Sequence, residues 1–243
     1  MATTMRVPAQ AEFAVMDPAT FVHGLREQLR QPGNGMYDHP FVRDVEAGTV
    51  TLSQLQFQTE QFYLHIRNML PWIGEICVKC PYPDVAQALV KNYAEEMLGT
   101  FTKTGPHPEL LLRFGESIGL DPEKARAAEQ VPASRRLTEY FEFMSTRRDW
   151  FVALAAIGIG LESFVPDLFT RLVAAFRTNY HLTNDDLIFW TMHILADSDH
   201  GDEGIEIVSK YATTPAERKV VYECTLETGQ RFYDMWNLYR TVE

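Results

Sequence analysis

The sequence NDDLIFWTMHILADSDH, residues 184–200, is the clearest indication of the fold. Asn184, Asp185 and Asp186 offer side chains that cap a helix, and the residues that follow are apolar nearly all the way round a helical wheel. A helix that is apolar on every side lies inside a protein rather than on its surface. The stretch therefore predicts a buried helix that other elements must surround.

The same stretch carries three metal-type donors on one helical face. His193, Asp197 and His200 fall within roughly 60° of one another on an α-helix, whereas Asp199 points about 120° away. Imidazole and carboxylate donors suit iron, manganese or zinc, and oxygen-rich surroundings favour iron or manganese. The alternative interpretation is a solvated polar face with two ordinary histidines.

The rest of the chain also predicts helices, and no alternating run is strong enough to predict a strand. Apolar spacing, caps and prolines predict helices over residues 17–31, 39–46, 53–73, 83–98, 108–118, 134–148, 150–176, 201–211 and 215–239, with a short one after Pro122. Either Thr51 or Ser53 is expected to cap the long helix that extends to Ile73. We expect the 150–176 helix to bend near Pro166, and Gly158 and Gly160 to mark a close helix approach. The fold class is all-α: a single bundle domain over residues 17–243 follows a flexible tail of residues 1–16.

Composition narrows the class of function. The chain has 243 residues, 46% of them hydrophobic, and a formal net charge of -11. This charge argues against binding to nucleic acid or to anionic membranes and agrees with a protein that handles a small-molecule substrate. We find no apolar run of about 18 residues and no signal-peptide pattern. We therefore expect a cytoplasmic location and no membrane partner.

The three cysteines do not form a disulfide framework. Cys77 and Cys80 match the spacing of redox and zinc motifs, but no second pair accompanies them. Packing is the preferred explanation.

Two further places carry acidic groups in apolar surroundings. Glu162 is the lone ionisable residue between Trp150 and Val165, so it needs a metal or a salt bridge unless it lies on an exposed edge. In the second place, one of Glu95 and Glu96 can face inward while the other meets solvent. His107 is predicted to cap the next helix and can reach the same centre; the alternative is a solvated face and a loop histidine.

The succession of these motifs resembles a known family. The matching residues are His39-Pro40-Phe41-Val42, Gly48-Thr49, Leu52-Ser53, Gln58 to His65, Asn92-x-x-x-Glu96, His107-Pro108-Glu109-Leu110, Glu162 and His193-x-x-x-Asp197-x-x-His200. They resemble the haem-oxygenase-like dinuclear metal oxidases, relatives of the pyrroloquinoline-quinone biosynthesis C protein, of TenA and of the chlamydial protein associating with death domains. The resemblance covers roughly residues 20–240.

The resemblance implies a seven-helix haem-oxygenase-like bundle with two Fe(II) ions, or manganese, and O2 as co-substrate. Glu96 is preferred to Glu95 because it matches the family by its distance from Asn92 and Gly99. The loop 100–106 lengthens the usual gap between the first Glu and His, which is a departure from the family pattern. The implied metal ligands are Glu96, His107, Glu162, His193, Asp197 and His200.

The implied function is a diiron oxidase or oxygenase that acts on an amino acid or an amino-acid-derived substrate by N-oxygenation, desaturation or oxidative C–C cleavage. Candidate substrate-binding residues are Arg231, Arg67 and Lys210, whose basic side chains could anchor a carboxylate, and Tyr63, which we expect to face the core. A homodimer is implied by the family. The alternatives are a metal-independent enzyme of the type of TenA and the quinone-biosynthesis C protein, and a non-catalytic binding protein.

Overall fold

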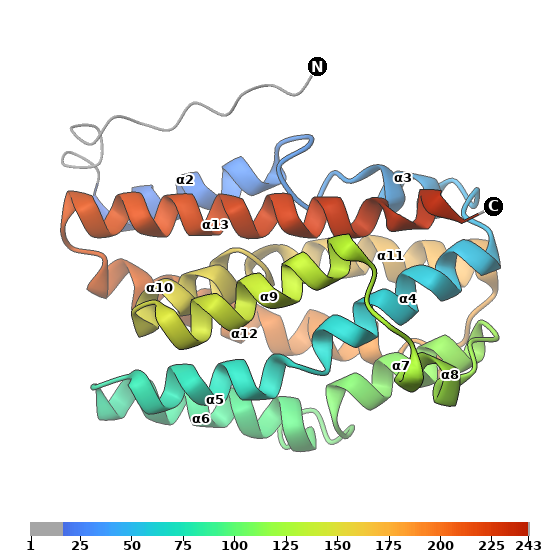
Figure 1. Ribbon diagram of the computed structural model, residues 1–243, viewed down its shortest axis with the longest axis horizontal. Coiled ribbons are helices and arrows are strands. Elements are labelled where there is room, and N and C mark those ends of the chain that lie inside the picture. Colours follow the sequence, from blue (N-terminus) through green and yellow to red (C-terminus); the bar gives the residue numbers. More distant parts are fainter. Residues whose placement is uncertain (1–16, 243) are drawn as a thin grey trace.

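The chain folds into layered helices, with no strand among residues 17–242 (Figure 1). This computed structural model describes residues 17–242, apart from the side chains of Ala19 and of residues 197–203. Helices α5 and α6 lie side by side along one edge, and α2 and α13 lie along the opposite edge. The all-α prediction is confirmed.

The helices begin where prolines and capping residues predicted. Prolines stand at the first position of α2, α3, α6, α8, α9 and α13, where a missing N–H costs nothing. The helical elements are α2 (Pro18–Arg30), α3 (Pro40–Glu46), α4 (Leu52–Ile66), α5 (Met69–Lys79), α6 (Pro83–Leu98), α7 (His107–Ser117), α8 (Pro122–Ala127), α9 (Pro132–Arg147), α10 (Trp150–Leu154), η1 (Ala155–Ile159), η2 (Glu162–Phe164), α11 (Val165–Tyr180), α12 (Ile188–Tyr211), α13 (Pro215–Trp236) and η3 (Asn237–Thr241).

Helix α12 is the buried helix that the 184–200 stretch predicted, and it is longer than expected. It packs against α11, α2, α7 and α10. The sequence predicted a second helix from Gly201, but one helix continues to Tyr211. A glycine costs a helix only about 1 kcal/mol, and the absence of a side chain at Gly204 allows close packing. A Cβ added there would lie 3.3 Å from the Cα of Gly158.

The long helix predicted over 53–73 is broken. Helix α4 ends at Ile66, and α5 begins at Met69 after the turn at Arg67 and Asn68. Pro71 explains the break because it has no N–H to bond the carbonyl of Arg67, and its ring would clash with that carbonyl in a continuous helix.

The segment between α10 and α11 is irregular, not merely bent at Pro166 as predicted. A π-helical turn, η1, leads into the 3₁₀ turn η2 that carries Glu162. The close approach predicted at Gly158 and Gly160 is confirmed, since a Cβ on Gly160 would lie 2.8 Å from Thr228. Such π-helical turns are frequent at functional sites.

Among the described residues, one helical segment, Trp150–Tyr180, is long and apolar enough to cross a membrane by length and composition. This finding corrects the expectation that the chain has no such apolar run. Because 83% of the apolar window is buried inside the bundle, its hydrophobicity is accounted for by packing in the core.

Candidate metal centre

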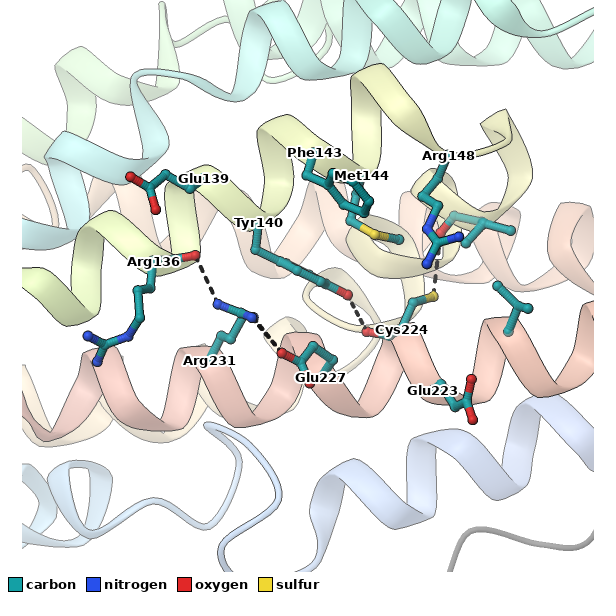
Figure 2. Close-up of a pocket in the computed structure, with 12 residues that line it drawn as sticks. Arg136, Glu139, Tyr140, Phe143, Met144, Arg148, Glu223, Cys224, Glu227 and Arg231 are labelled. Atoms are coloured by element: carbon teal, nitrogen blue, oxygen red, sulfur yellow. Dashed lines mark hydrogen bonds and ion pairs between the residues drawn. The ribbon is translucent and has the colours of Figure 1, made fainter.

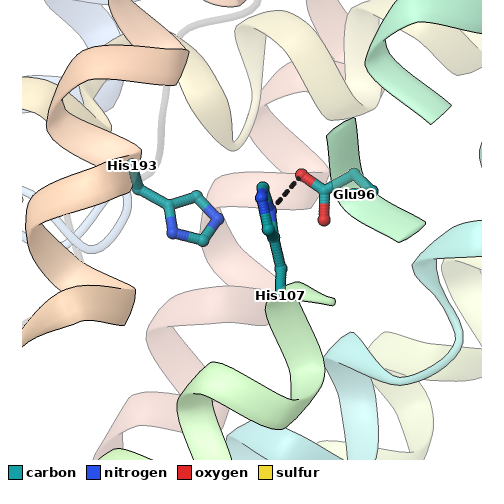
Figure 3. Close-up of side chains that lie close together, drawn as sticks. All are labelled: Glu96, His107 and His193. Atoms are coloured by element: carbon teal, nitrogen blue, oxygen red, sulfur yellow. Dashed lines mark ion pairs between the residues drawn. The ribbon is translucent and has the colours of Figure 1, made fainter. Parts of the chain in front are cut away.

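Three of the predicted ligands meet inside the bundle (Figure 3). Glu96 comes from the end of α6, His107 from the start of α7 and His193 from α12. One ligand atom from each lies within 4.8 Å of the other two. Two ligand atoms on opposite sides of one metal ion are about 4.2 Å apart, so this spacing is close to that of a metal site.

The loop between α6 and α7 folds back on itself and brings Glu96 and His107 together. Gly99 ends α6 in a left-handed conformation, with φ 60°. A Cβ on Gly99 would lie 2.3 Å from the backbone nitrogen of Gly105, so only glycine fits this turn. His107 is the first residue of α7 rather than its cap, which corrects the prediction, because Pro106 stands at the cap position. The lengthened loop therefore still delivers His107 to Glu96.

His193 is oriented by its own helix. Its Nδ1–H donates to the carbonyl oxygen of Phe189 at 2.7 Å, because a carbonyl can only accept. The proton on Nδ1 leaves Nε2 of the neutral ring as the atom with a lone pair. A backbone carbonyl that fixes the tautomer in this way is typical of metal-binding histidines.

His107 lies between two carboxylates and is wholly buried. Its Nδ1 is 2.9 Å from Oε1 of Glu96, and its Nε2 is 3.4 Å from Oε1 of Glu95. Burial alone would lower the pKa of His107, but the two carboxylates outweigh burial and raise it above its ordinary value.

The contact between His107 and Glu96 provides a test of whether a metal fits. Despite its short distance from Glu96, Nδ1 of His107 has no hydrogen-bond partner of acceptable geometry among the described residues. A buried polar atom without a hydrogen bond is costly. A cation placed between the imidazole and the carboxylate would satisfy both groups, so the residues present fit a metal.

Glu162 belongs to the same region. It is buried, and with Glu96 and His193 it lines a cavity of about 40 Å³. The other lining residues are apolar: Phe62, Ile66, Met69, Leu161, Val165, Phe169 and Phe189. Glu162 therefore lies in the core and not on an exposed edge.

The two remaining predicted ligands lie outside the described side chains. The backbone of Asp197 and His200 is helical and continues α12 after His193. Their positions on one face of that helix follow from the spacing alone. Both residues stay predictions.

The Glu95 side chain has a structural role that the sequence did not predict. We expected one of the two adjacent glutamates to meet solvent, but both are buried. The Glu95 carboxylate accepts hydrogen bonds from the backbone and hydroxyl groups of the loop after α6. Burial would raise the pKa of Glu95, but these hydrogen bonds lower it below its ordinary value. The threonines Thr100 and Thr102 were the only signal in the sequence.

The four candidate substrate-binding residues do not line the 40 Å³ cavity. Arg231 borders a separate groove of about 610 Å³ between α9 and α13, where it pairs with Glu227 (Figure 2). Lys210 is exposed and faces Asp84 at 3.7 Å. Arg67 is exposed and donates to the carbonyl of Arg126, and Tyr63 is buried on α4 with the guanidinium of Arg67 over its ring.

His65 and the cysteines have partners in the core. His65 hydrogen-bonds Thr138 and packs its ring against Trp72, Phe141 and Phe232, so it serves core packing. Phe62 lines the cavity. All three cysteines are free, and Cys77 and Cys80 pack against the core.

The bundle and its buried site define the class of the protein. A TenA homologue from Pseudomonas syringae pv. tomato superposes with a TM-score of 0.76 at 11% identity, over 99% of this chain and 99% of that one. The fold is the all-α haem-oxygenase-like fold.

The family follows from the sequence. Residues 57–231 match the family of iron-containing redox enzymes, and the chain belongs to that family. It is 24% identical over 200 residues to 4-aminobenzoate synthase of Nitrosomonas europaea, covering 78% of this chain and 79% of that protein. It is 28% identical over 204 residues to pyrroloquinoline-quinone synthase of Rhodopseudomonas palustris, covering 81% of this chain and 78% of that protein.

Proposed function

We propose that this protein is a non-haem diiron oxidase or oxygenase that uses O2 to oxidise a small molecule. The observation that carries the proposal is the cluster of buried Glu96, buried His107 and half-buried His193, which adjoins the cavity that Glu162 lines. Membership of an iron-containing redox family supports it. The six proposed ligands are Glu96, His107, Glu162, His193, Asp197 and His200.

Charge balance favours two cations over one. Glu96, Glu162 and Asp197 would bring three negative charges into an interior where an unpaired carboxylate is very costly. The buried carboxylate of Glu95, which faces His107, adds a fourth negative charge. One divalent ion therefore leaves a net charge of -2 on these four carboxylates, while two divalent ions neutralise them. We therefore propose two Fe(II) ions, with manganese as the alternative metal.

The residues of the chain supply the environment for the chemistry. Bound iron(II) supplies the electrons and open coordination positions that reduction of dioxygen requires. Phe62, Phe169 and Phe189 surround the carboxylates with apolar surface, which keeps bulk water away from the reacting atoms. The tautomer of His193, fixed by the Phe189 carbonyl, keeps Nε2 ready to bind metal without rearrangement.

The cavity also bears on the substrate. A volume of about 40 Å³ has room for one or two water-sized molecules. A larger substrate has to displace lining side chains, and two of these, Leu161 in the irregular segment before η2 and His193, are only half-buried. The substrate class we propose is an amino acid or its derivative. Its apolar part would face the metals, because no cationic side chain lines the described cavity.

Metal content and oxygen uptake test this function together. Wild type and the variants His193→Ala and Glu162→Ala are loaded anaerobically with ferrous iron, assayed for bound iron, and then exposed to O2 with candidate substrates. We expect about two irons per chain in wild type and loss of iron and of O2 consumption in both variants. Unchanged iron content in both variants would exclude the site.

A matched pair on α12 tests the ligands outside the described side chains. Asp197→Asn removes a predicted ligand, and Asp199→Asn makes the same change on a different helical face. We expect iron loss only for Asp197→Asn. Equal iron loss in both variants would indicate a general effect of charge and would exclude Asp197 as a specific ligand.

A further inference from the structure

The carboxylate of Glu95 is the centre of a hydrogen-bond network that no metal is needed to explain. Glu95 is 1% exposed. Its Oε2 accepts from the backbone N–H of Phe101 and the hydroxyl of Thr100. Its Oε1 accepts from the backbone N–H and the hydroxyl of Thr102 and faces Nε2 of His107 at 3.4 Å.

These hydrogen bonds show that Glu95 is not a metal ligand. A carboxylate has about four lone-pair positions, and five groups already approach the two oxygens. Glu95 is not part of the three-residue donor cluster, although its neighbour Glu96 is. The lone-pair positions of Glu95 are therefore all occupied by donors from the loop and from His107.

We infer that Glu95 is a positioning residue that closes the loop 99–106 and fixes the ring of His107 so that Nδ1 faces Glu96. The inference rests on the proposed function, since the metals would bind at Nδ1. The inference also explains how a loop longer than the family pattern still places His107 beside Glu96. The Glu95 carboxylate fixes the loop by accepting hydrogen bonds from the backbone N–H groups of Phe101 and Thr102.

The tautomer of His107 follows from this contact. Both ring nitrogens of His107 face a carboxylate, but only Nε2 has hydrogen-bond geometry, toward Oε1 of Glu95. Because a carboxylate can only accept, a neutral His107 carries its proton on Nε2 and leaves the lone pair on Nδ1. A carboxylate behind a metal-binding histidine also makes the ring more basic, and its loss typically lowers metal affinity about 10–100-fold.

Glu95→Gln tests the inference because the two side chains have the same shape. The backbone N–H of Phe101 donates to the Oε2 position alone, whereas the N–H of Thr102 is shared between both oxygens. The hydroxyl of Thr102, which faces Oε1, can also accept a hydrogen bond. The amide oxygen of glutamine therefore takes the Oε2 position. The NH2 group then faces Nε2 of His107, which has to accept. We therefore expect E95Q to move the proton of the neutral His107 ring to Nδ1, the atom that the metal needs.

Two readouts measure this change. Nitrogen-15 NMR of metal-free protein, at a pH where His107 is neutral, reports which ring nitrogen carries the proton. Anaerobic titration with Co(II) reports affinity and the visible spectrum of the site. The control is Glu109→Gln, which removes an exposed carboxylate paired with Arg126 in the first turn of α7. We expect Nε2–H in wild type and in the control, Nδ1–H in E95Q, and Co(II) affinity about 10–100-fold lower only in E95Q.

An unchanged tautomer in E95Q together with wild-type Co(II) affinity would overturn the inference. If E95Q fails to fold, measurements on the wild-type protein still test the inference. A proton on Nδ1 of the neutral His107 ring, or rapid hydrogen exchange at the amides of Phe101 and Thr102, would also overturn the inference. Wild type that binds neither Co(II) nor Fe(II) would contradict the proposed function instead, while the NMR measurement on metal-free protein would still decide the part of Glu95.

Discussion

The imidazole of His107 and the carboxylate of Glu96 lie 2.9 Å apart in the interior, and neither can turn to solvent because 0% and 8% of their side chains are exposed. This buried pair is the element of the site that responds most directly to pH. Without a metal, a protonated His107 offsets the charge of Glu96.

We expect the metal-free protein to lose stability as the pH rises. The two carboxylates raise the pKa of His107 above its unfolded value of 6.5. The stability from the charged ring is thus fully present below pH 6.5 and disappears as the pH rises through the folded-state pKa. Each unit by which the pKa is raised is worth about 1.4 kcal/mol. Urea unfolding with a chelator present, across a pH series, measures the trend.

The control for this trend is His107→Gln, which cannot be charged. The difference in unfolding free energy between wild type and this variant should shrink as the pH rises. A difference that stays constant across the series would contradict the assignment of the alkaline loss to His107.

On the acid side, His65 should cause the opposite trend. Burial lowers its pKa to about 3, so the folded protein holds the ring neutral. Its contribution is present above the unfolded value of 6.5 and is lost as the pH falls from there toward 3. His65→Gln should lower stability at neutral pH and flatten the acid limb of the stability curve. A variant limb as steep as that of wild type would show that other groups govern acid unfolding.

The sequence predicted the helices well where local chemistry marks their ends. Pro83 and Gly99 bound α6, and Thr214 with Pro215 starts α13, because proline and capping side chains act on their own few residues. It failed where tertiary packing decides. Continuation of α12 past Gly201 depends on contact with the distant Gly158, and no local pattern reports such a contact.

The candidate site divides in the same way. Residue types and their order, together with the family resemblance, predicted Glu96, His107 and His193, which the fold brings together. The part of Glu95 could not be predicted, because its main partners are backbone N–H groups of a loop. Periodicity carries no information about where a loop places its amides. The homodimer and the cytoplasmic location stay predictions.

Gly160 should be intolerant of even a methyl group. A Cβ there would lie 2.5 Å from the carbonyl oxygen of Ala156 and 2.8 Å from Thr228. We expect Gly160→Ala to lower the free energy of unfolding by about 1–3 kcal/mol, because inserted volume forces neighbours apart. Since Gly160 lies just before η2, iron binding should weaken as well. Chemical denaturation and iron content measure the two effects.

Gly24→Ala is the matched control for that substitution. Gly24 lies in helix α2 with nothing within 4 Å of an added Cβ. Alanine there should stabilise the protein by about 0.5–1 kcal/mol, since alanine loses less backbone entropy than glycine in a helix. Equal effects at the two positions would contradict the close approach of Gly160 to Thr228.

Ferrous iron should stabilise the fold, because the ligands come from separate helices that only the folded chain brings together. A ligand at 100 times its dissociation constant adds about 2.7 kcal/mol to the free energy of unfolding. In a domain of this size that corresponds to a rise in Tm of roughly 5–10 °C. His193→Ala removes a donor from the cluster, so its Tm should respond far less to iron. Mg²⁺, which prefers oxygen ligands in octahedral geometry, should leave the wild-type Tm unchanged. Anaerobic calorimetry measures all three, and an equal rise in wild type and His193→Ala would place the bound iron elsewhere in the protein.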